Sequence, residues 1–252
     1  MAEVTGATLI VNWDSNPVKV KSFNFTNQYA NLDSTSSATT NSGTESVAGR
    51  GKRSFKIDSH LYDGSAVKIT GANLAVTLGG ATFKATNLTF EMNYTELDAT
   101  NTGTDANGTE FVGGRIKCTS KFDAIMYRDT AEKLTDAIPT PIACVITFKS
   151  GVTVTGNVLL HQEDITDDVN GICKVSYSAD WVGFPTLVAV SQFTFNTEET
   201  LQVIWETGSG TNKEVSGTAI ILGMSVSVDV NGDANVTYSG VFNGTITPAV
   251  YS

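Results

Sequence analysis

Hydrophobic and polar residues alternate over long stretches of this chain, with the period of two that is typical of β-strands. Residues 88–95 (LTFEMNYT) alternate strictly, so one face of the expected strand is apolar and the other polar. Residues 23–29 follow the same pattern, with Tyr29 expected on the apolar face. The segments 53–62 and 118–127 return with apolar residues on that side, which predicts two β-hairpins with long polar loops.

The hairpin pattern belongs to an internal repeat. Residues 6–65 align with 71–130 at an offset of 65 without gaps and are identical at about a third of positions, where chance gives about one in twelve. Residues 156–183 align with 217–244 at an offset of 61 and share Asp-Val-Asn-Gly. We therefore interpret the chain as a duplication.

The order of the repeats is first half, first half, second half, second half. Because few residues separate the two first halves, the two domains are either nested or crossed. Knotted connections are rare, so we favour an inner domain at 66–188 inserted into an outer domain formed by 1–65 plus 189–252. The crossed pairing, in which the domains interlock, stays open.

The expected fold class is all-β with one short helix at 128–138, which Pro139 ends. We expect two similar domains of the β-sandwich or partial-barrel type. Asn170-Gly171 and Asn231-Gly232 predict tight hairpins with two-residue type I′ turns, since this turn needs positive φ at both positions.

The formal charge of −10 and the absence of a basic run argue against a protein that grips nucleic acid. The start of the sequence has no signal-peptide pattern and no apolar stretch is long enough to span a membrane, so we expect a soluble, unexported chain. Cys118, Cys144 and Cys173 share no metal-ligand spacing and are expected to be buried free thiols.

Catalytic motifs are absent from the sequence, and we expect no enzyme, no cofactor and no metal. The histidines His60 and His161 share no ligand motif with the cysteines, and His60 is expected to be solvated. The segment DITDDVNG offers oxygen ligands but does not complete a calcium loop, and its Asn-Gly already has a turn role.

A hairpin with a long polar loop, a short helix, the strand VITFKSG and a hairpin ending in VNGICKVSYSADWVG follow one another between about 71 and 184. This order resembles the major tail tube proteins of long-tailed bacteriophages, relatives of injection-system tubes. The resemblance implies a structural virion protein, assembled in the host cytoplasm, whose rings stack into a tube that conducts DNA without binding it specifically. It also implies hairpins that complete a β-barrel between subunits, other tail proteins as partners, and no membrane. With two domains per chain, the ring is expected to be a trimer with pseudo-sixfold symmetry.

The resemblance also assigns roles to the two loops, 33–49 and 98–114, which would reach the adjacent ring. The Arg of each Gly-Arg pair bridges to acidic residues of a neighbour, or the Gly supplies a bulge and the Arg lies in solvent. The expected stacking residues are Asp33, Ser42, Gly43, Thr44, Glu45, Gly49, Arg50, Asp98, Asn107, Gly108, Thr109, Glu110, Gly114 and Arg115.

The polar strand faces would line the lumen, where hydroxyls, amides and carboxylates do not hold phosphates. Lys56, Lys121 and Lys174 share these faces and either pair with Asp58, Asp123 or Asp180 or meet other subunits. The alternative is that the faces are only solvated. The candidates are Asn24, Thr26, Gln28, Asp58, Thr89, Glu91, Asn93, Thr95, Asp123, Ser176, Ser178, Asp180, Thr237 and Ser239.

The rival function is a β-sandwich binding module, such as a receptor-binding or fibre-attached virion protein or an adhesin. Its binding loops would be expected to carry aromatic residues, and these loops carry almost none.

Overall fold

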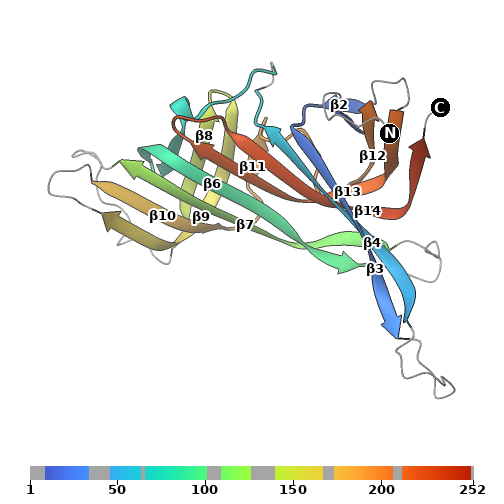
Figure 1. Ribbon diagram of the computed structural model, residues 1–252. Helices are drawn as coiled ribbons and strands as arrows, with labels where there is room; N and C mark the ends of the chain where they lie inside the picture. Colours follow the sequence, from blue (N-terminus) through green and yellow to red (C-terminus); the bar gives the residue numbers. More distant parts are fainter. Residues whose placement is uncertain are drawn as a thin grey trace.

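The computed structural model describes residues 9–33, 46–63, 66–100, 109–125, 140–166, 173–206 and 212–250. Within these ranges the chain is all-β: the regular elements are fourteen strands and one short 3₁₀ turn, η2 (Gly71–Asn73). Each strand pairing is antiparallel and the strands form one connected sheet, as Figure 1 shows. The helix expected at 128–138 lies outside the described residues.

Strands from the middle of the chain pair with one another in a closed circuit, β5–β6–β7–β10–β9–β8 and back to β5. The short strand β11 (Thr186–Val188) adds to β9. The circuit consists of β5 (Ala75–Leu78), β6 (Ala81–Asp98), β7 (Phe111–Ile125), β8 (Ile142–Lys149), β9 (Val152–Thr166) and β10 (Lys174–Trp181).

Strands from the two ends of the chain form a matching set, in which β1 pairs with β2 and β12, β13 with β12 and β14, and β4 with β14 and β3. In this set β1 pairs with β12 and β4 pairs with β14, so strands from both ends of the chain lie side by side. The set consists of β1 (Leu9–Trp13), β2 (Asn16–Val18), β3 (Ser22–Asp33), β4 (Ser46–His60), β12 (Glu198–Glu206), β13 (Asn212–Asp229) and β14 (Asn235–Val250).

The two sets have the same strand register at the offsets found in the sequence. Ser22 opposes Asp58 in the β3–β4 hairpin, and Asn87 opposes Asp123 in the β6–β7 hairpin, 65 residues later. Both hairpins shift register immediately after a tyrosine, Tyr29 or Tyr94. The hairpins β9–β10 and β13–β14 agree in the same way at an offset of 61.

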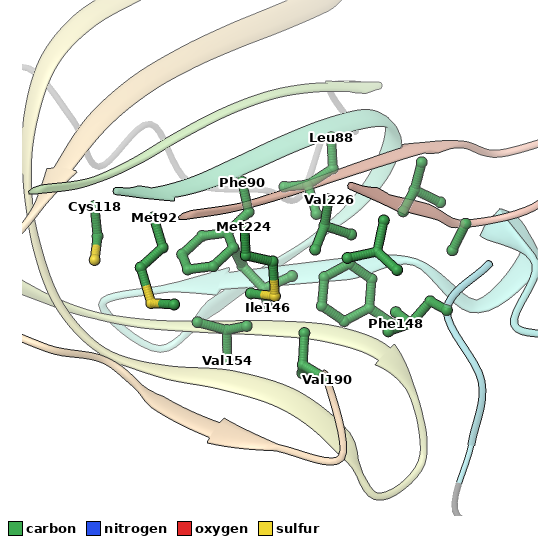
Figure 2. Close-up of a cluster of buried hydrophobic side chains, with 14 of the residues drawn as sticks. Leu88, Phe90, Met92, Cys118, Ile146, Phe148, Val154, Val190, Met224 and Val226 are labelled. Atoms are coloured by element: carbon green, nitrogen blue, oxygen red, sulfur yellow. The ribbon is translucent and has the colours of Figure 1, made fainter. Parts of the chain in front are cut away.

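One ladder joins the two sets. Residues Gly223–Asp229 of β13 pair with Asn87–Asn93 of β6, an interface that we call the internal seam. Figure 2 shows that the core is continuous across it: Met224 and Val226 of β13 lie in the same cluster as Phe90 of β6. Apolar residues of both sets therefore share one hydrophobic core.

One local expectation about this fold was wrong, the type I′ turn at Asn231-Gly232. Five residues separate β13 from β14, and Asn231 and Gly232 both have ordinary negative φ. This loop is held from outside, because the Gly71 amide donates to the Gly232 carbonyl (2.9 Å), so no type I′ turn is needed. Tyr29 lies on the same side of β3 as Phe25, as expected, but it is 53% exposed because β3 has no further strand on its outer side in the described part of the chain. The Asn170-Gly171 turn lies outside the described residues.

Candidate polar sheet face

Eight strands follow one another in the order β9, β10, β7, β6, β13, β14, β4 and β3 and share one face. Directly opposed residues of an antiparallel pair point to the same side, so the ladder registers trace continuous rows across all eight strands. We call this side the polar sheet face. One row that crosses it consists of Gln162, Ser178, Lys121, Thr89, Ser227, Asn235 and His60.

The opposite side of the same strands is apolar. Phe90, Val226 and Tyr238 are all fully buried there. A sheet with one face on a core and one face toward solvent is the usual result of strict alternation in antiparallel strands. The chain therefore presents a broad polar wall backed by its own hydrophobic core.

The fourteen candidate lumen residues all lie on strands of the polar sheet face, and none of them is fully buried. They come from six strands, β3, β4, β6, β7, β10 and β14, which the fold brings together from distant parts of the sequence. Thr95 lies at the end of this set, opposite the register shift in β7.

Sequence reasoning missed the contribution of β13 and β9 to this face. Ser225 and Ser227 lie between the two groups of candidates, opposite Glu91 and Thr89. The signal was available, because the segment GMSVSVDV alternates serine with apolar residues. Alternation alone did not reveal which strand joins the two sets.

Two carboxylates of the polar sheet face are held by hydroxyl and amide donors. The hydroxyls of Ser22 and Thr237 donate to Asp58, at 2.8 and 2.7 Å. At the equivalent position, the Ser176 hydroxyl (2.5 Å) and the Asn87 side-chain amide (3.4 Å) donate to Asp123.

The pKa of Asp58 follows from this environment. Partial burial tends to raise the pKa, but the hydrogen bonds from Thr237 and Ser22 and the charge of Lys56 outweigh it and lower the pKa below its usual value. The carboxylate therefore stays ionised, and hydroxyl donors of the neighbouring strands stabilise its charge.

Of the two alternatives for Lys56, Lys121 and Lys174, ion pairing with Asp58, Asp123 or Asp180 is not found among the described residues, although the charge of Lys56 acts on Asp58. The donors of neighbouring strands already occupy the two carboxylates described above, so the lysine ammonium groups lie on the same face without that role.

The face carries two equivalent shallow hollows, one in each set of strands. The first is lined in part by Asn24, Thr26 and Lys56. The second is lined by residues that include Thr89, Glu91 and Lys121, the positions 65 residues later. Both hollows are open and mixed in charge, and neither has the converging apolar walls of a small-molecule pocket.

The candidate stacking loops are only partly described. The strand ends leave 34–45 and 99–110 as connections, and Ser42, Gly43, Thr44, Glu45, Asn107 and Gly108 lie outside the described residues. Asp33 ends β3 and Asp98 ends β6. At the base of the second loop, the Thr109 hydroxyl donates to the Gly51 carbonyl of β4 at 3.0 Å, and the Glu110 amide donates to the Thr100 hydroxyl at 2.9 Å.

The Gly-Arg pairs lie within strands and not in the loops. Gly49-Arg50 in β4 and Gly114-Arg115 in β7 fill the register shift of each hairpin, where two residues oppose one. A side chain at position 114 would come within 2.9 Å of Leu97, which explains the glycine there. Arg115 is exposed, and no ion pair of its guanidinium is found in the described part of the chain.

The remaining titratable groups give no reactive constellation. No group of three or more His, Cys, Asp or Glu able to hold a metal occurs among the described residues. Cys118 and Cys144 are buried free thiols, as expected, and burial raises the pKa of Cys144 to about 12. Cys173, also expected to be buried, is only half-buried, because it lies just before the start of β10. His60 is not solvated: its side chain is 13% exposed, 3.6 Å from Asp233, and burial and the Lys68 charge lower its pKa.

The described residues contain no helix with the length and hydrophobicity needed to cross a membrane. Comparison of the chain with protein-family models and with curated proteins found no match.

Proposed function

We propose that this chain is a structural virion protein that forms the stacked rings of a phage tail tube, the conduit for DNA ejection. The observation that carries the proposal is the polar sheet face, which continues across eight strands and has a hydrophobic core behind it. A wall of this kind suits the inside of a water-filled duct, where a partner slides and is not held.

The chemistry of the wall fits the passage of DNA. Phosphates are retained by arrays of Lys and Arg, whose binding releases counterions. On this face the lysines are interspersed with carboxylates such as Asp58 and Asp123, and most other groups are neutral hydroxyls and amides. The chain as a whole has a net charge of −10, so it repels nucleic acid at a distance.

The repeated register supports the duplicated form of this proposal. Two similar partial-barrel domains, one at 66–188 inserted into the other at 1–65 plus 189–252, account for two matching sets of strands and two equivalent hollows. Three such chains supply six domains, so a trimeric ring with pseudo-sixfold symmetry follows. The loops at 34–45 and 99–110 then stack one ring on the next, and closure of the sheet removes its exposed edges.

Negative-stain electron microscopy of the purified protein with class averaging tests the proposal. Hollow rings or tubes, built from three chains that each show two similar lobes, are expected. A deletion of residues 36–46 is expected to leave rings that no longer stack. A dispersed monomer at high concentration would overturn the tube and favour the rival binding module, which a glycan-binding assay then tests.

DNA retention tests the role of the wall itself. Tubes with Asn24→Lys and Thr89→Lys, at equivalent sites of the polar sheet face of which the first is exposed and the second half-buried, should retain short DNA in a salt-dependent manner, whereas unaltered tubes release it. The matched control is Thr186→Lys on β11, an exposed site on a strand that is not one of the eight of this face. Equal retention by the control and the wall variant would contradict a DNA-conducting lumen.

A further inference from the structure

Two strand edges have no partner in the described part of the chain. Pairing of β9 with β8 ends at Val158, so Gln162–Thr166 is paired on one side only, with β10. The outer edge of β3 is also unpaired, because β3 forms a ladder with β4 alone. Such edges expose rows of backbone donors and acceptors that invite another strand.

These two edges are the repeat equivalents of the internal seam. Subtracting 61 from Gly223–Ser227 of β13 gives Gln162–Thr166 of β9, and subtracting 65 from Asn87–Asn93 of β6 gives Ser22–Gln28 of β3. The chain thus carries a second version of each half of the seam. The two halves lie at opposite ends of the eight-stranded order, so they do not meet within one copy (Figure 1).

The burial of equivalent side chains differs between the two versions. In the internal seam, Val226 opposes Phe90, and both are fully buried. Their equivalents are Ile165, which is 52% exposed, and Phe25, which is half-buried. The exposed apolar surface therefore lies where the internal seam would cover it.

We propose that the β9 edge of one copy pairs antiparallel with the β3 edge of a second copy, in the register of the internal seam. Ile165 then lies opposite Phe25 on the core side, and Asp164 lies opposite Thr26 on the polar sheet face. The inference rests on the proposed ring assembly and specifies which strands, and which residue pairs, join its chains. Because the contact is head to tail, it generates either closed rings or open filaments.

The next row on the core side adds charge complementarity to this contact. In the internal seam the row is apolar apart from one hydroxyl, whereas the equivalent row between copies brings a Glu from β9 toward an Asn and a buried Arg from β3 and β4. Inward-pointing charges on a free edge also oppose non-specific strand addition, which keeps single copies soluble. The internal row is Tyr238, Met224, Met92 and Cys118, and the row between copies is Tyr177, Glu163, Asn27 and Arg53.

Disulfide trapping tests the register. Hydrogen-bonded and non-hydrogen-bonded pairs alternate along an antiparallel ladder, so one of two successive pairs has the Cα separation of about 4.5 Å that suits a disulfide. The two variants are Asp164→Cys/Thr26→Cys and Ile165→Cys/Phe25→Cys. The out-of-register control is Asp164→Cys/Phe25→Cys, whose side chains lie on opposite faces.

The internal seam supplies a positive control, because Ser225→Cys/Glu91→Cys is the equivalent of the first variant and should close within one chain. The unaltered protein, with its own three cysteines, is the blank. After mild oxidation we expect covalent multimers from at least one in-register variant, with at least a fivefold higher yield than from the out-of-register control.

The outcomes separate this inference from the proposed function. Rings without a cross-link in either in-register variant, or with an equal yield from the out-of-register control, overturn the register and leave the ring assembly standing. Cross-linked filaments without rings support the register and overturn the tube. Neither rings nor cross-links at high concentration overturn both.

Discussion

Two equivalent phenylalanines offer a matched test of the role of the internal seam in stability. Phe90 of β6 contacts Trp181 edge to face, with 5.8 Å between ring centroids, and Phe25 of β3 contacts Phe242 in the same way at 5.8 Å. The two aromatic partners are themselves equivalent at an offset of 61. They differ in that β13 pairs with β6 beside Phe90, whereas no strand pairs with the outer edge of β3 beside Phe25 in the described part of one copy.

The expected losses follow from this difference. Replacing a fully buried phenylalanine by alanine removes its transfer free energy and leaves a cavity, which together cost about 3–5 kcal/mol. Replacing a half-buried phenylalanine by alanine loses only about half of a transfer free energy of about 1.5–3 kcal/mol. It leaves no empty cavity, because water fills the space. In the dispersed chain, Phe90→Ala should therefore lower the free energy of unfolding by about 2–3 kcal/mol more than Phe25→Ala.

Both losses can be measured by urea unfolding followed by tryptophan fluorescence, at a protein concentration where the copies are separate. If the slope of the free energy against urea concentration is unchanged, the shift of the transition midpoint gives the loss of stability. If Phe90→Ala does not fold, the pair Phe90→Leu and Phe25→Leu gives the same ranking with smaller values. Losses that agree within about 0.5 kcal/mol would refute the reasoning, because they would mean that β13 adds nothing to the burial of Phe90.

Three further predictions concern single sites. Gly240→Ala would bring a Cβ within 2.3 Å of the Ile220 carbonyl oxygen. It should lower the free energy of unfolding in urea by about 2 kcal/mol or more. The control Gly232→Ala, whose Cβ has its nearest contact at 3.7 Å, should change the free energy of unfolding by less than about 0.5 kcal/mol. The lowered pKa of Asp58 means that its contribution is full above the unfolded pKa of about 3.9 and is lost as pH falls through the folded pKa. Asp58→Asn should therefore cost about 1 kcal/mol at pH 7 and nearly nothing at pH 2, and a constant loss at both would contradict this. Cys144, with its pKa raised to about 12, should react with a thiol reagent only at the rate of unfolding, and rapid labelling of this residue in the native protein would show that it is not buried.

Much of the fold was accessible from the sequence, because alternation and repetition are local signals. The hairpins ending at His60 and Ile125, the apolar face of β6 and the polar lumen candidates followed from a period of two. The register shift after Tyr94 followed less directly, from the glycine at position 114, since glycine is common in one class of β-bulge. These features depend on neighbours in the chain.

Features that depend on distant partners were not accessible. The type I′ turn at Asn231-Gly232 was wrong because contacts from Gly71 and its neighbours hold that loop in another conformation. The burial of His60 depends on packing beside Asp233, which a pattern of alternation does not reveal. The internal seam between β6 and β13 is likewise a tertiary contact, and no spacing in the sequence predicts which strand edge meets which.

The repeats keep their register although about two thirds of their aligned residues differ, so register here depends on few positions. A shift by one residue would exchange the two faces of every strand, and the buried core forbids it. Side chains at the sheet edges do not have that constraint, and their polarity depends on whether another strand lies against them. On the side of the seam Met224 faces a strand of its own chain, whereas its equivalent Glu163 is paired only with β10 in the described structure, and a charge at its free edge favours solubility. The divergence between the repeats is therefore itself a record of where the chain is covered by itself and where, under the proposed assembly, a second copy covers it.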